Sequence, residues 1–468
     1  MAATYGELTG HPGACVVTRG PGAASAVNGV AHALLDRAPM LIVTDTVPAN
    51  EAARVSHQRI DQPVLFKAVS KWSVSTGTTT AREAVEAALE VACRPPAGPV
   101  HVDFDPATSA LDPPPTPQWV EADEMAHARQ LVEEARAPVV AVGVGARRAA
   151  KAVRRALAGV GCPVLTTYKA KGIVPECGAN AAGFLTGAML ESDLLHRADL
   201  IIAVGVDPVE LIPAAWPYDA PLLALSEWLS DSTYFQPRLE IIGQLEESLA
   251  VLEPLATRRL HARETGFAAL QRALDVPGEG LLPQDLVKAV RAACPRGTIA
   301  TIDSGAHMFA AMTYWTVEAP GEALISSGLA TMGFALPAAI AASHTYPERR
   351  VVCLTGDGGL GMALAELETA ARYALPVLVV VFNDAALSLI EIKQQDKEGG
   401  PNAVGYSDAD FSKVAHGLGL GSSRVTTVVE LETALVEALA QDGPFLIDAT
   451  VDAGNYREVL RAIRGASG

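Results

Sequence analysis

The chain has 468 residues, of which 49% are hydrophobic and 19% charged, and its formal net charge is −17. This length predicts two or three domains with sizeable cores, and the negative charge disfavours nucleic acid or an anionic membrane as a partner. No apolar run approaches about 18 residues, the N-terminus has no signal pattern, and the six cysteines form no CxxC pair. We therefore expect a globular cytoplasmic protein that binds no nucleic acid and no membrane.

The first part of the chain predicts an α/β domain that ends near residue 115. Residues 15–18, 40–44 and 99–104 are short apolar runs typical of buried strands. A helical pattern covers about 23–36, and the proline-rich stretch 112–117 indicates a linker.

The middle of the chain predicts a Rossmann-like domain over 125–250. An apolar strand at 137–146 runs into glycines and is followed by a basic helix at 147–157, and further strands are expected at 163–166 and 200–205. Gly143 and Gly145 suggest a dinucleotide turn, but the third glycine and the acidic ribose partner are absent, which favours an ordinary connection. A charged stretch at 246–277 is expected to be a helical connector.

The third region, 278–468, begins with a predicted strand at 298–303, a turn at 304–307 and a helix at 308–314. A turn of small residues at 326–334 leads into an alanine-rich helix at 335–343. Small residues at such a turn let a ligand lie directly against the backbone.

The most informative stretch is 351–394. It contains, in order, an apolar strand at 351–355, the sequence Gly356-Asp357-Gly358-Gly359, a helix at about 361–372, a second apolar strand at 377–382 and the pair Asn383-Asp384. A right-handed crossover places both strand ends at one edge of a sheet, so Asp357 and Asp384 should face each other. Glycine turns admit anions and carboxylates bind Mg²⁺, so we predict a metal–diphosphate site; the alternative is a plain βαβ unit.

This arrangement resembles the cofactor signature of the thiamine-diphosphate enzymes, which is GDG followed about two dozen residues later by two asparagines. The resemblance implies that Asp357, Asp384 and the main-chain carbonyl of Ala386 hold Mg²⁺. Asp384 stands where the family commonly has asparagine, but an aspartate still offers an oxygen to the metal. The cofactors implied are thiamine diphosphate and Mg²⁺.

The N-terminal segment resembles the pyrimidine-binding domain of the acetohydroxyacid (acetolactate) synthase branch of the same family. The matching elements are Met1-Ala2, Tyr5-Gly6, residues 18–22 and residues 38–48. The implied fold is α/β, with three domains that are each a doubly wound, mostly parallel sheet. Their expected bounds are 1–115 for a pyrimidine-binding domain lacking its N-terminal part, 125–250 for the central domain, and 278–468 for the diphosphate- and Mg-binding domain.

Further site residues follow from the resemblance. Gln58 is expected on the substrate side of the cofactor, and Met332 is expected to support its folded shape. The cofactor-binding set is Gly305, Ala306, His307, Ala330, Met332, Gly356, Asp357, Gly358, Gly359, Asp384, Leu387 and Leu389. The alternatives are a solvated amide for Gln58, a core side chain for Met332 and a surface residue for His307. The arginine-bearing loop expected for FAD is not apparent at 206–216, so FAD is unresolved and its absence is favoured.

One departure concerns catalysis. The family's activating glutamate would lie about six residues before Met1, where the chain as given has no position; it would contribute on the order of 10²–10⁴-fold in rate. We expect a start further upstream that supplies it.

The leading hypothesis is a thiamine-diphosphate-dependent transferase or lyase that decarboxylates a small 2-oxo acid and ligates the product, as acetolactate synthase does. The alternatives are a 2-oxo acid decarboxylase without ligation, a non-catalytic cofactor-binding protein, and an ordinary nicotinamide dehydrogenase. The family's sites form between two chains, which implies a homodimer or a homotetramer.

Overall fold

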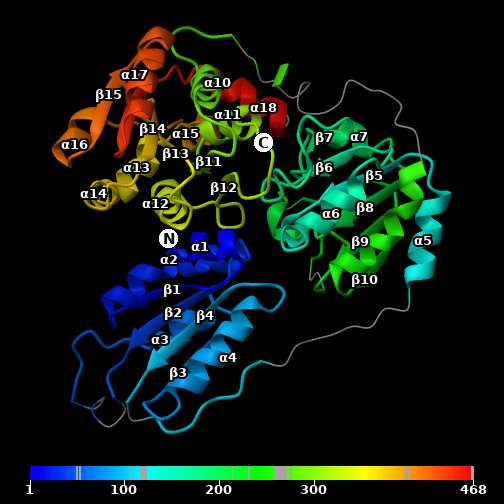
Figure 1. Cartoon of the computed structure of the whole chain (residues 1–468), viewed down its shortest axis with the longest axis horizontal. Coiled ribbons are helices and arrows are strands. Elements are labelled where there is room, and N and C mark those ends of the chain that lie inside the picture. The colour runs from blue at the N-terminus through cyan, green and yellow to red at the C-terminus, as the bar shows by residue number, and fades with distance from the viewer. Residues whose placement is uncertain are drawn as a thin grey trace. The chain divides into compact units, whose positions relative to one another are not determined.

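The computed structural model describes residues 1–48, 51, 54–106, 108–115, 124–212, 214–229, 232–257, 271–272, 275, 277–395 and 400–464. The chain divides into two compact units. Unit 1 comprises Met1–Val120 and Ser327–Thr331, and unit 2 comprises Glu121–Ser326 and Met332–Gly468. Three sheets with parallel strands and flanking helices confirm the predicted three-domain α/β fold (Figure 1).

Unit 1 contains a four-stranded sheet in the order β1-β2-β4-β3. Its strands are β1 (Gly13–Val17), β2 (Met40–Asp45), β3 (Trp72–Thr76) and β4 (Pro99–Phe104), and its helices are α1 (Ala2–Thr9), α2 (Pro21–Leu35), α3 (Gln62–Lys67) and α4 (Ala81–Cys93). Neighbouring residues of β2 point to opposite faces, so Ile42 enters one core with Phe66 and Leu41 enters another with Val91. Helices therefore cover both faces, as in a doubly wound sheet.

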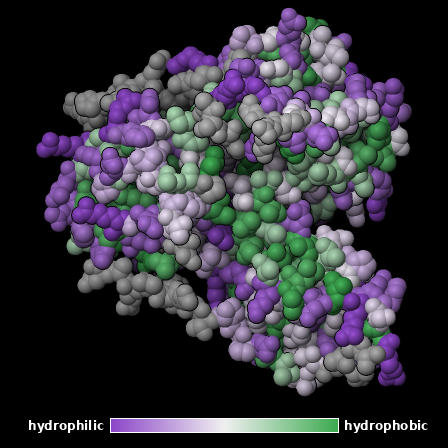
Figure 2. Space-filling model, turned by 180° about the vertical axis from the view of Figure 1, so that it is seen from behind, coloured by the Kyte–Doolittle hydropathy of each residue, from purple (hydrophilic) through white to green (hydrophobic). Residues whose placement is uncertain are grey.

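Strand β1 forms one edge of this sheet, and Val16 on it is 75% exposed. Among the described strands, β1 pairs with β2 alone. Other large apolar side chains are also exposed, among them Val64, Met362 and Val436. On the face shown in Figure 2, hydrophobic residues gather in patches within a more polar surface.

The segment Ser327–Thr331 belongs to unit 1 through contacts with α2 and the residue after it. The Asp36 carboxylate accepts the backbone N–H groups of Ser327 (2.9 Å) and Gly328 (3.4 Å). The Asn28 amide donates to the Thr331 hydroxyl at 3.0 Å. A Cβ on Gly328 would lie 2.8 Å from the Leu35 carbonyl oxygen, so only glycine permits this close approach.

The central sheet of unit 2 has the strand order β10-β9-β8-β5-β6-β7. Its strands are β5 (Pro138–Val142), β6 (Val164–Thr166), β7 (Ala181–Phe184), β8 (Leu200–Val204), β9 (Leu222–Ser226) and β10 (Leu239–Ile242), and its α-helices are α5 (Met125–Glu134), α6 (Ala150–Leu157), α7 (Ser192–Leu195) and α8 (Leu245–Ser248). The basic helix begins at Ala150 rather than at residue 147, because Val144–Arg147 forms a 3₁₀ turn. Of the predicted connector, Leu249–Thr257 is 3₁₀-helical, and most of its remainder lies outside the described residues.

The third sheet has the order β12-β11-β13-β14-β16-β15. Its strands are β11 (Ile299–Ile302), β12 (Ala323–Ile325), β13 (Val351–Gly356), β14 (Val377–Asn383), β15 (Gly421–Val425) and β16 (Phe445–Thr450). Its helices are α10 (Pro283–Ala293), α11 (His307–Tyr314), α12 (Ala335–Thr345), α13 (Asp357–Ala363), α14 (Glu366–Arg372), α15 (Ser388–Gln395), α16 (Phe411–Gly417), α17 (Val428–Ala440) and α18 (Tyr456–Arg464). No helix among the described residues is long and apolar enough to cross a membrane.

The single helix predicted over 361–372 is wrong. The first helix begins at Asp357, directly after β13, and a second begins at Glu366. Between the two helices the backbone hydrogen bonds span three residues instead of four, since the Leu367 N–H donates to the Leu364 carbonyl and the Glu368 N–H donates to the Ala365 carbonyl.

A buried ion pair connects the central sheet of unit 2 to the region of the third sheet. Lys171 and Glu176 lie between β6 and β7 and contact each other. The Lys171 ammonium also donates to the Met312 carbonyl at 2.8 Å, and Glu176 accepts the Val317 N–H at 3.1 Å. The segment between β6 and β7 therefore anchors the central sheet to helix α11 of the third sheet and to the residues that follow this helix.

Candidate cofactor and metal site

Three neighbouring parallel strands end at one edge of the third sheet. Ile302 of β11 pairs with Leu354 of β13, and Gly356 of β13 pairs with Phe382 of β14. The residues that follow these strands therefore meet at this edge, as the crossover argument predicted for Asp357 and Asp384.

Asp357 is the first residue of α13, and its two carboxylate oxygens have different surroundings. Oδ1 accepts the Gly358 N–H at 2.6 Å and the Tyr406 hydroxyl at 2.6 Å. Oδ2 is buried, and no described residue donates a hydrogen bond to it. Burial raises the pKa of Asp357. A buried oxygen without a donor is costly unless a cation binds it.

Asp384 stands at the end of β14. Its Oδ2 accepts the Ser388 hydroxyl at 2.5 Å, and its Oδ1 accepts the Ala386 N–H at 3.3 Å. Burial, and in addition the negative charge of Asp357, raise the pKa of Asp384 to about 6. The two carboxylates thus act on each other electrostatically, and a bound cation would remove their repulsion.

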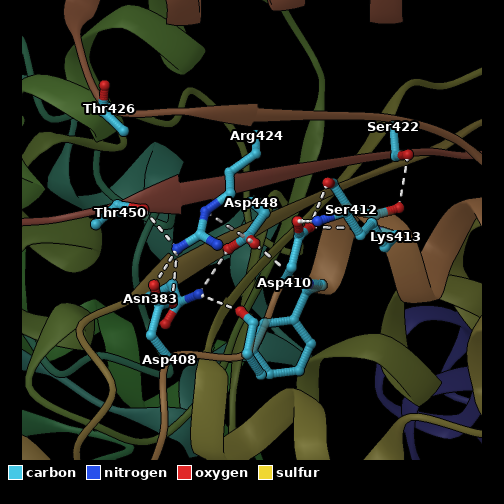
Figure 3. A network of polar contacts seen from close by, with 12 residues as sticks. Asn383, Asp408, Asp410, Ser412, Lys413, Ser422, Arg424, Thr426, Asp448 and Thr450 are labelled. Carbon is cyan, nitrogen blue, oxygen red and sulfur yellow. Dashed lines mark hydrogen bonds and ion pairs between the residues drawn. The ribbon is translucent and has the colours of Figure 1, made fainter.

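Asn383 points away from this edge. Its amide donates to Asp448 Oδ1 and to the Ala409 carbonyl, both at 2.9 Å (Figure 3). It therefore ties β14 to β16 and to the segment before α16, which leaves Asp384 as the member of the pair that faces Asp357.

His307 begins α11 and is 4% exposed, which excludes the alternative of a surface histidine. Its ring stacks on Phe382 with 5.0 Å between the ring centroids, and burial lowers its pKa to about 4. Its Nε2 and the nearby Ser304 hydroxyl are buried and have no hydrogen-bond partner among the described residues. A neutral ring beside an unpartnered hydroxyl suits the oxygens of an anion.

Met332 and Leu387 converge on Gly358. A Cβ built on Gly358 would lie 2.7 Å from Leu387 Cδ2, 3.2 Å from Met332 Cε and 3.2 Å from the Tyr406 hydroxyl. A side chain at this position would therefore clash with Leu387, so glycine permits this close packing. Similarly, a Cβ on Gly305 would lie 2.8 Å from His307 Nδ1, and one on Gly356 would lie 3.2 Å from it.

The other predicted residues have different surroundings. Gly359 is a packing position, because a Cβ there would lie 2.3 Å from Asp303 Oδ2. Ala306 is buried at the N-cap of α11, and Leu389 on α15 packs against the core that contains Phe309. Gln58 (φ 56°) and Ala330 (φ 50°) belong to unit 1.

The sequence interpretation missed three polar residues at this edge: Asp303, Ser388 and Tyr406. Asp303 accepts hydrogen bonds from Thr355, Ser304, Gly333 and Phe334, and burial raises its pKa to about 6. The sequence Asp303-Ser304-Gly305 at the end of a predicted strand could have indicated that Asp303 lies at the site. No sequence pattern pointed to Tyr406, since it lies 49 residues after Asp357 in an irregular segment.

The donor set fits Mg²⁺ bound together with a diphosphate. Among the described residues no group of three His, Cys, Asp or Glu side chains is arranged to hold a metal ion. Mg²⁺ sites commonly use only one or two carboxylates, and phosphate oxygens and water complete the octahedron. The unpartnered Asp357 Oδ2 and the neighbouring Asp384 match that requirement.

Comparison with known proteins identifies the family of the chain. Models of the thiamine pyrophosphate enzymes match three parts of the chain: the N-terminal TPP binding domain at 1–65, the central domain at 125–250 and the C-terminal TPP binding domain at 303–449. The chain therefore belongs to the thiamine pyrophosphate (thiamine diphosphate) enzyme family, and it is a thiamine-diphosphate-dependent enzyme.

Within this family the chain is acetolactate synthase-like. It is 30% identical over 480 residues to acetolactate synthase of Bacillus subtilis (strain 168), which covers 97% of this chain and 84% of the relative. It is 29% identical to the large subunit of acetolactate synthase isozyme 2 of Escherichia coli (strain K12), over 96% of this chain and 86% of the relative. It is also 29% identical to the catabolic acetolactate synthase of Raoultella terrigena, over 98% of this chain and 86% of the relative.

Proposed function

We propose that the protein decarboxylates a small 2-oxo acid and joins the remaining fragment to a second carbonyl compound, as the name acetolactate synthase indicates for its relatives. The observation that carries this proposal is the similarity to acetolactate synthase over 97% of the chain. It is supported by the two carboxylates that meet at the carboxyl edge of the third sheet.

In this proposal Asp357, Asp384 and the carbonyl of Ala386 hold Mg²⁺. The neutral His307 ring and the loop containing Gly305 and Ala306 contact the diphosphate, while Gly356 and Gly358 leave room for it. Met332 and Leu387 hold the cofactor rings in a folded shape. Thiamine diphosphate supplies an electron sink for the bond that breaks, and the protein supplies binding, orientation and exclusion of water.

For three further residues we propose the roles that the family resemblance implies. Gln58 is assigned to the substrate side of the cofactor, Ala330 to a backbone contact with it, and Leu389 to the substrate channel. Gly359 contributes through its packing against Asp303.

The test is product analysis with pyruvate, thiamine diphosphate and Mg²⁺. Acetolactate would support ligation, and acetaldehyde without acetolactate would identify a simple decarboxylase. If the cofactor binds but no CO₂ is released from any of several 2-oxo acids, the protein only binds the cofactor and the proposed activity is wrong.

We propose that the central domain works without FAD. The topological switch point of its sheet lies between β5 and β8, where nucleotide phosphates bind in such folds. Here the Val144 N–H donates to Glu210 Oε2 at 2.9 Å, and the Gly145 N–H donates to the Gly205 carbonyl at 2.8 Å. The amides that would bind a phosphate therefore already have partners in Glu210 and Gly205. An absorption spectrum of the purified protein tests this: a bound flavin band would overturn it.

We also propose domain bounds of 1–115, 125–250 and 278–468, and a homodimer or homotetramer. The bounds are supported by one sheet in each range and by the family models at 1–65, 125–250 and 303–449. The oligomer is supported by the resemblance, since family sites form between two chains. Light scattering of the purified protein tests it, and a monomer that binds the cofactor would overturn it.

A further inference from the structure

Tyr406 contacts the candidate metal ligand from a segment outside the sheet. Its side chain is 43% exposed, yet its hydroxyl reaches inward and donates to Asp357 Oδ1 at 2.6 Å. The Gly358 N–H donates to the same oxygen at 2.6 Å. One carboxylate oxygen of Asp357 therefore has two donors, whereas the buried Oδ2 has none among the described residues.

The backbone before Tyr406 is joined to the loop that carries the other proposed ligands. Ala386 and Gly405 form an antiparallel bridge. The Leu387 N–H donates to the Val404 carbonyl at 2.8 Å, and the Tyr406 N–H donates to the Ala385 carbonyl at 3.0 Å. Tyr406 is thereby held in a fixed position relative to Asp384 and the Ala386 carbonyl.

The backbone after Tyr406 is anchored to the sheet by a second set of contacts. The Arg424 guanidinium on β15 donates to both oxygens of Asp408 at 2.6 Å (Figure 3). Asn383 donates to the Ala409 carbonyl, and the Phe411 N–H donates to Asp448 Oδ2 at 2.9 Å. Both sides of Tyr406 are fixed, so its hydroxyl has little freedom to follow a rotating carboxylate.

We propose that Tyr406 is a positioning residue that orients Asp357, holding Oδ1 by its hydroxyl so that Oδ2 faces the cation. This inference rests on the proposed Mg²⁺–thiamine diphosphate function. A metal-ligating carboxylate that loses such a support binds its metal typically 10–100-fold more weakly, because it can rotate away from the binding geometry. Removal of the hydroxyl alone should therefore weaken the metal site.

The test is a Mn²⁺ titration in the presence of thiamine diphosphate, with free Mn²⁺ measured by electron paramagnetic resonance. The variant Tyr406→Phe should bind Mn²⁺ about 10-fold more weakly than the wild type. Its unfolding free energy without metal should fall by only about 1 kcal/mol, because one hydrogen bond is lost and the fold remains intact. At saturating Mn²⁺ it should still bind thiamine diphosphate at wild-type stoichiometry. The matched control is Tyr373→Phe, which removes the hydroxyl of a tyrosine that is 63% exposed at the end of α14 and should leave the affinity unchanged.

A second variant keeps the hydroxyl and loosens its support. Asp408→Asn removes the charge that Arg424 holds, and we expect a smaller loss of Mn²⁺ affinity in the same direction. Wild-type affinity in Tyr406→Phe would overturn the proposal, and tighter binding would overturn it by making the hydroxyl a competitor of the metal. If the wild type itself binds no Mn²⁺ with thiamine diphosphate, the proposed function fails, and this inference fails with it.

Discussion

The Thr355 hydroxyl donates to Asp303 Oδ2 at 3.0 Å and so joins the carboxyl ends of strands β13 and β11. The same carboxylate also accepts the backbone N–H groups of Ser304, Gly333 and Phe334. Asp303 thus links the His307 turn, the turn after Met332 and the strand that precedes Asp357. It shapes the site without being one of its proposed ligands.

We expect Asp303→Asn to destabilise the protein by about 1–3 kcal/mol, because the new amide group would face the Gly333 N–H and leave that donor unpaired. Thr355→Val removes one hydroxyl donor and should cost about 1 kcal/mol. Urea denaturation of both variants measures the difference. Equal losses would mean that the Gly333 contact contributes little.

Asp357→Asn should separate folding from metal binding. The variant removes a buried charge without a partner at Oδ2, so its unfolding midpoint without metal should equal or exceed that of the wild type. The stabilisation by Mg²⁺ and thiamine diphosphate should disappear, because the Gly358 N–H and the Tyr406 hydroxyl hold the amide oxygen at the Oδ1 position and the NH₂ group then faces the cation. Differential scanning fluorimetry with and without both ligands measures this.

Asp384→Asn is the matched control for Asp357→Asn. An asparagine oxygen can still bind the metal, so this variant should keep the stabilisation by Mg²⁺ and thiamine diphosphate, whereas Asp384→Ala should lose it. If both Asp384→Asn and Asp384→Ala keep the stabilisation, residue 384 is not a metal ligand.

These residues also show what the sequence could and could not predict. Asp357 and Asp384 were predictable because two buried strands with a helical segment between them favour a parallel crossover, which fixes where both strands end. The break at Leu364 was not predictable, because apolar residues continue at helical spacing through it. Tyr406 and Asp408 were not predictable, because their partners are set by tertiary contacts of an irregular segment. The burial of His307 required knowing that Phe382 covers its ring.

Glu210 should make stability depend on pH. Burial raises the pKa of Glu210 from 4.5 to about 7, so the folded state binds a proton that the unfolded state releases between these values. Its contribution is fully present below about pH 4.5 and is lost as the pH rises through 7. Glu210→Gln does not titrate, and Thr167 can reverse its hydroxyl to accept the new amide.

We therefore expect Glu210→Gln to equal the wild type near pH 5 and to exceed its unfolding free energy by about 1–3 kcal/mol at pH 8. Urea denaturation at both pH values measures this, with the exposed Glu247→Gln as control. A difference that does not change with pH would contradict the raised pKa.

The buried ion pair of Lys171 and Glu176 should be sensitive to removal of one partner. Lys171→Met leaves the Glu176 charge buried and should cost about 3–5 kcal/mol, and the double variant with Glu176→Leu should recover part of this loss. Lys288→Met breaks a half-exposed pair with Asp275 and should cost less than about 1 kcal/mol. Equal losses for Lys171→Met and Lys288→Met would show that Lys171 is not held by a buried charge.

The segment Ser327–Thr331 limits how the protein can be divided for separate expression. The Asp36 carboxylate accepts hydrogen bonds from the backbone N–H groups of Ser327 and Gly328, which lie 291 and 292 positions later in the chain. A polypeptide that stops at Val120 would lack both donors. Asn28 would lose its acceptor in Thr331 as well. A stand-alone version of unit 1 should therefore carry residues 327–331 on a flexible linker, or receive them as a synthetic peptide.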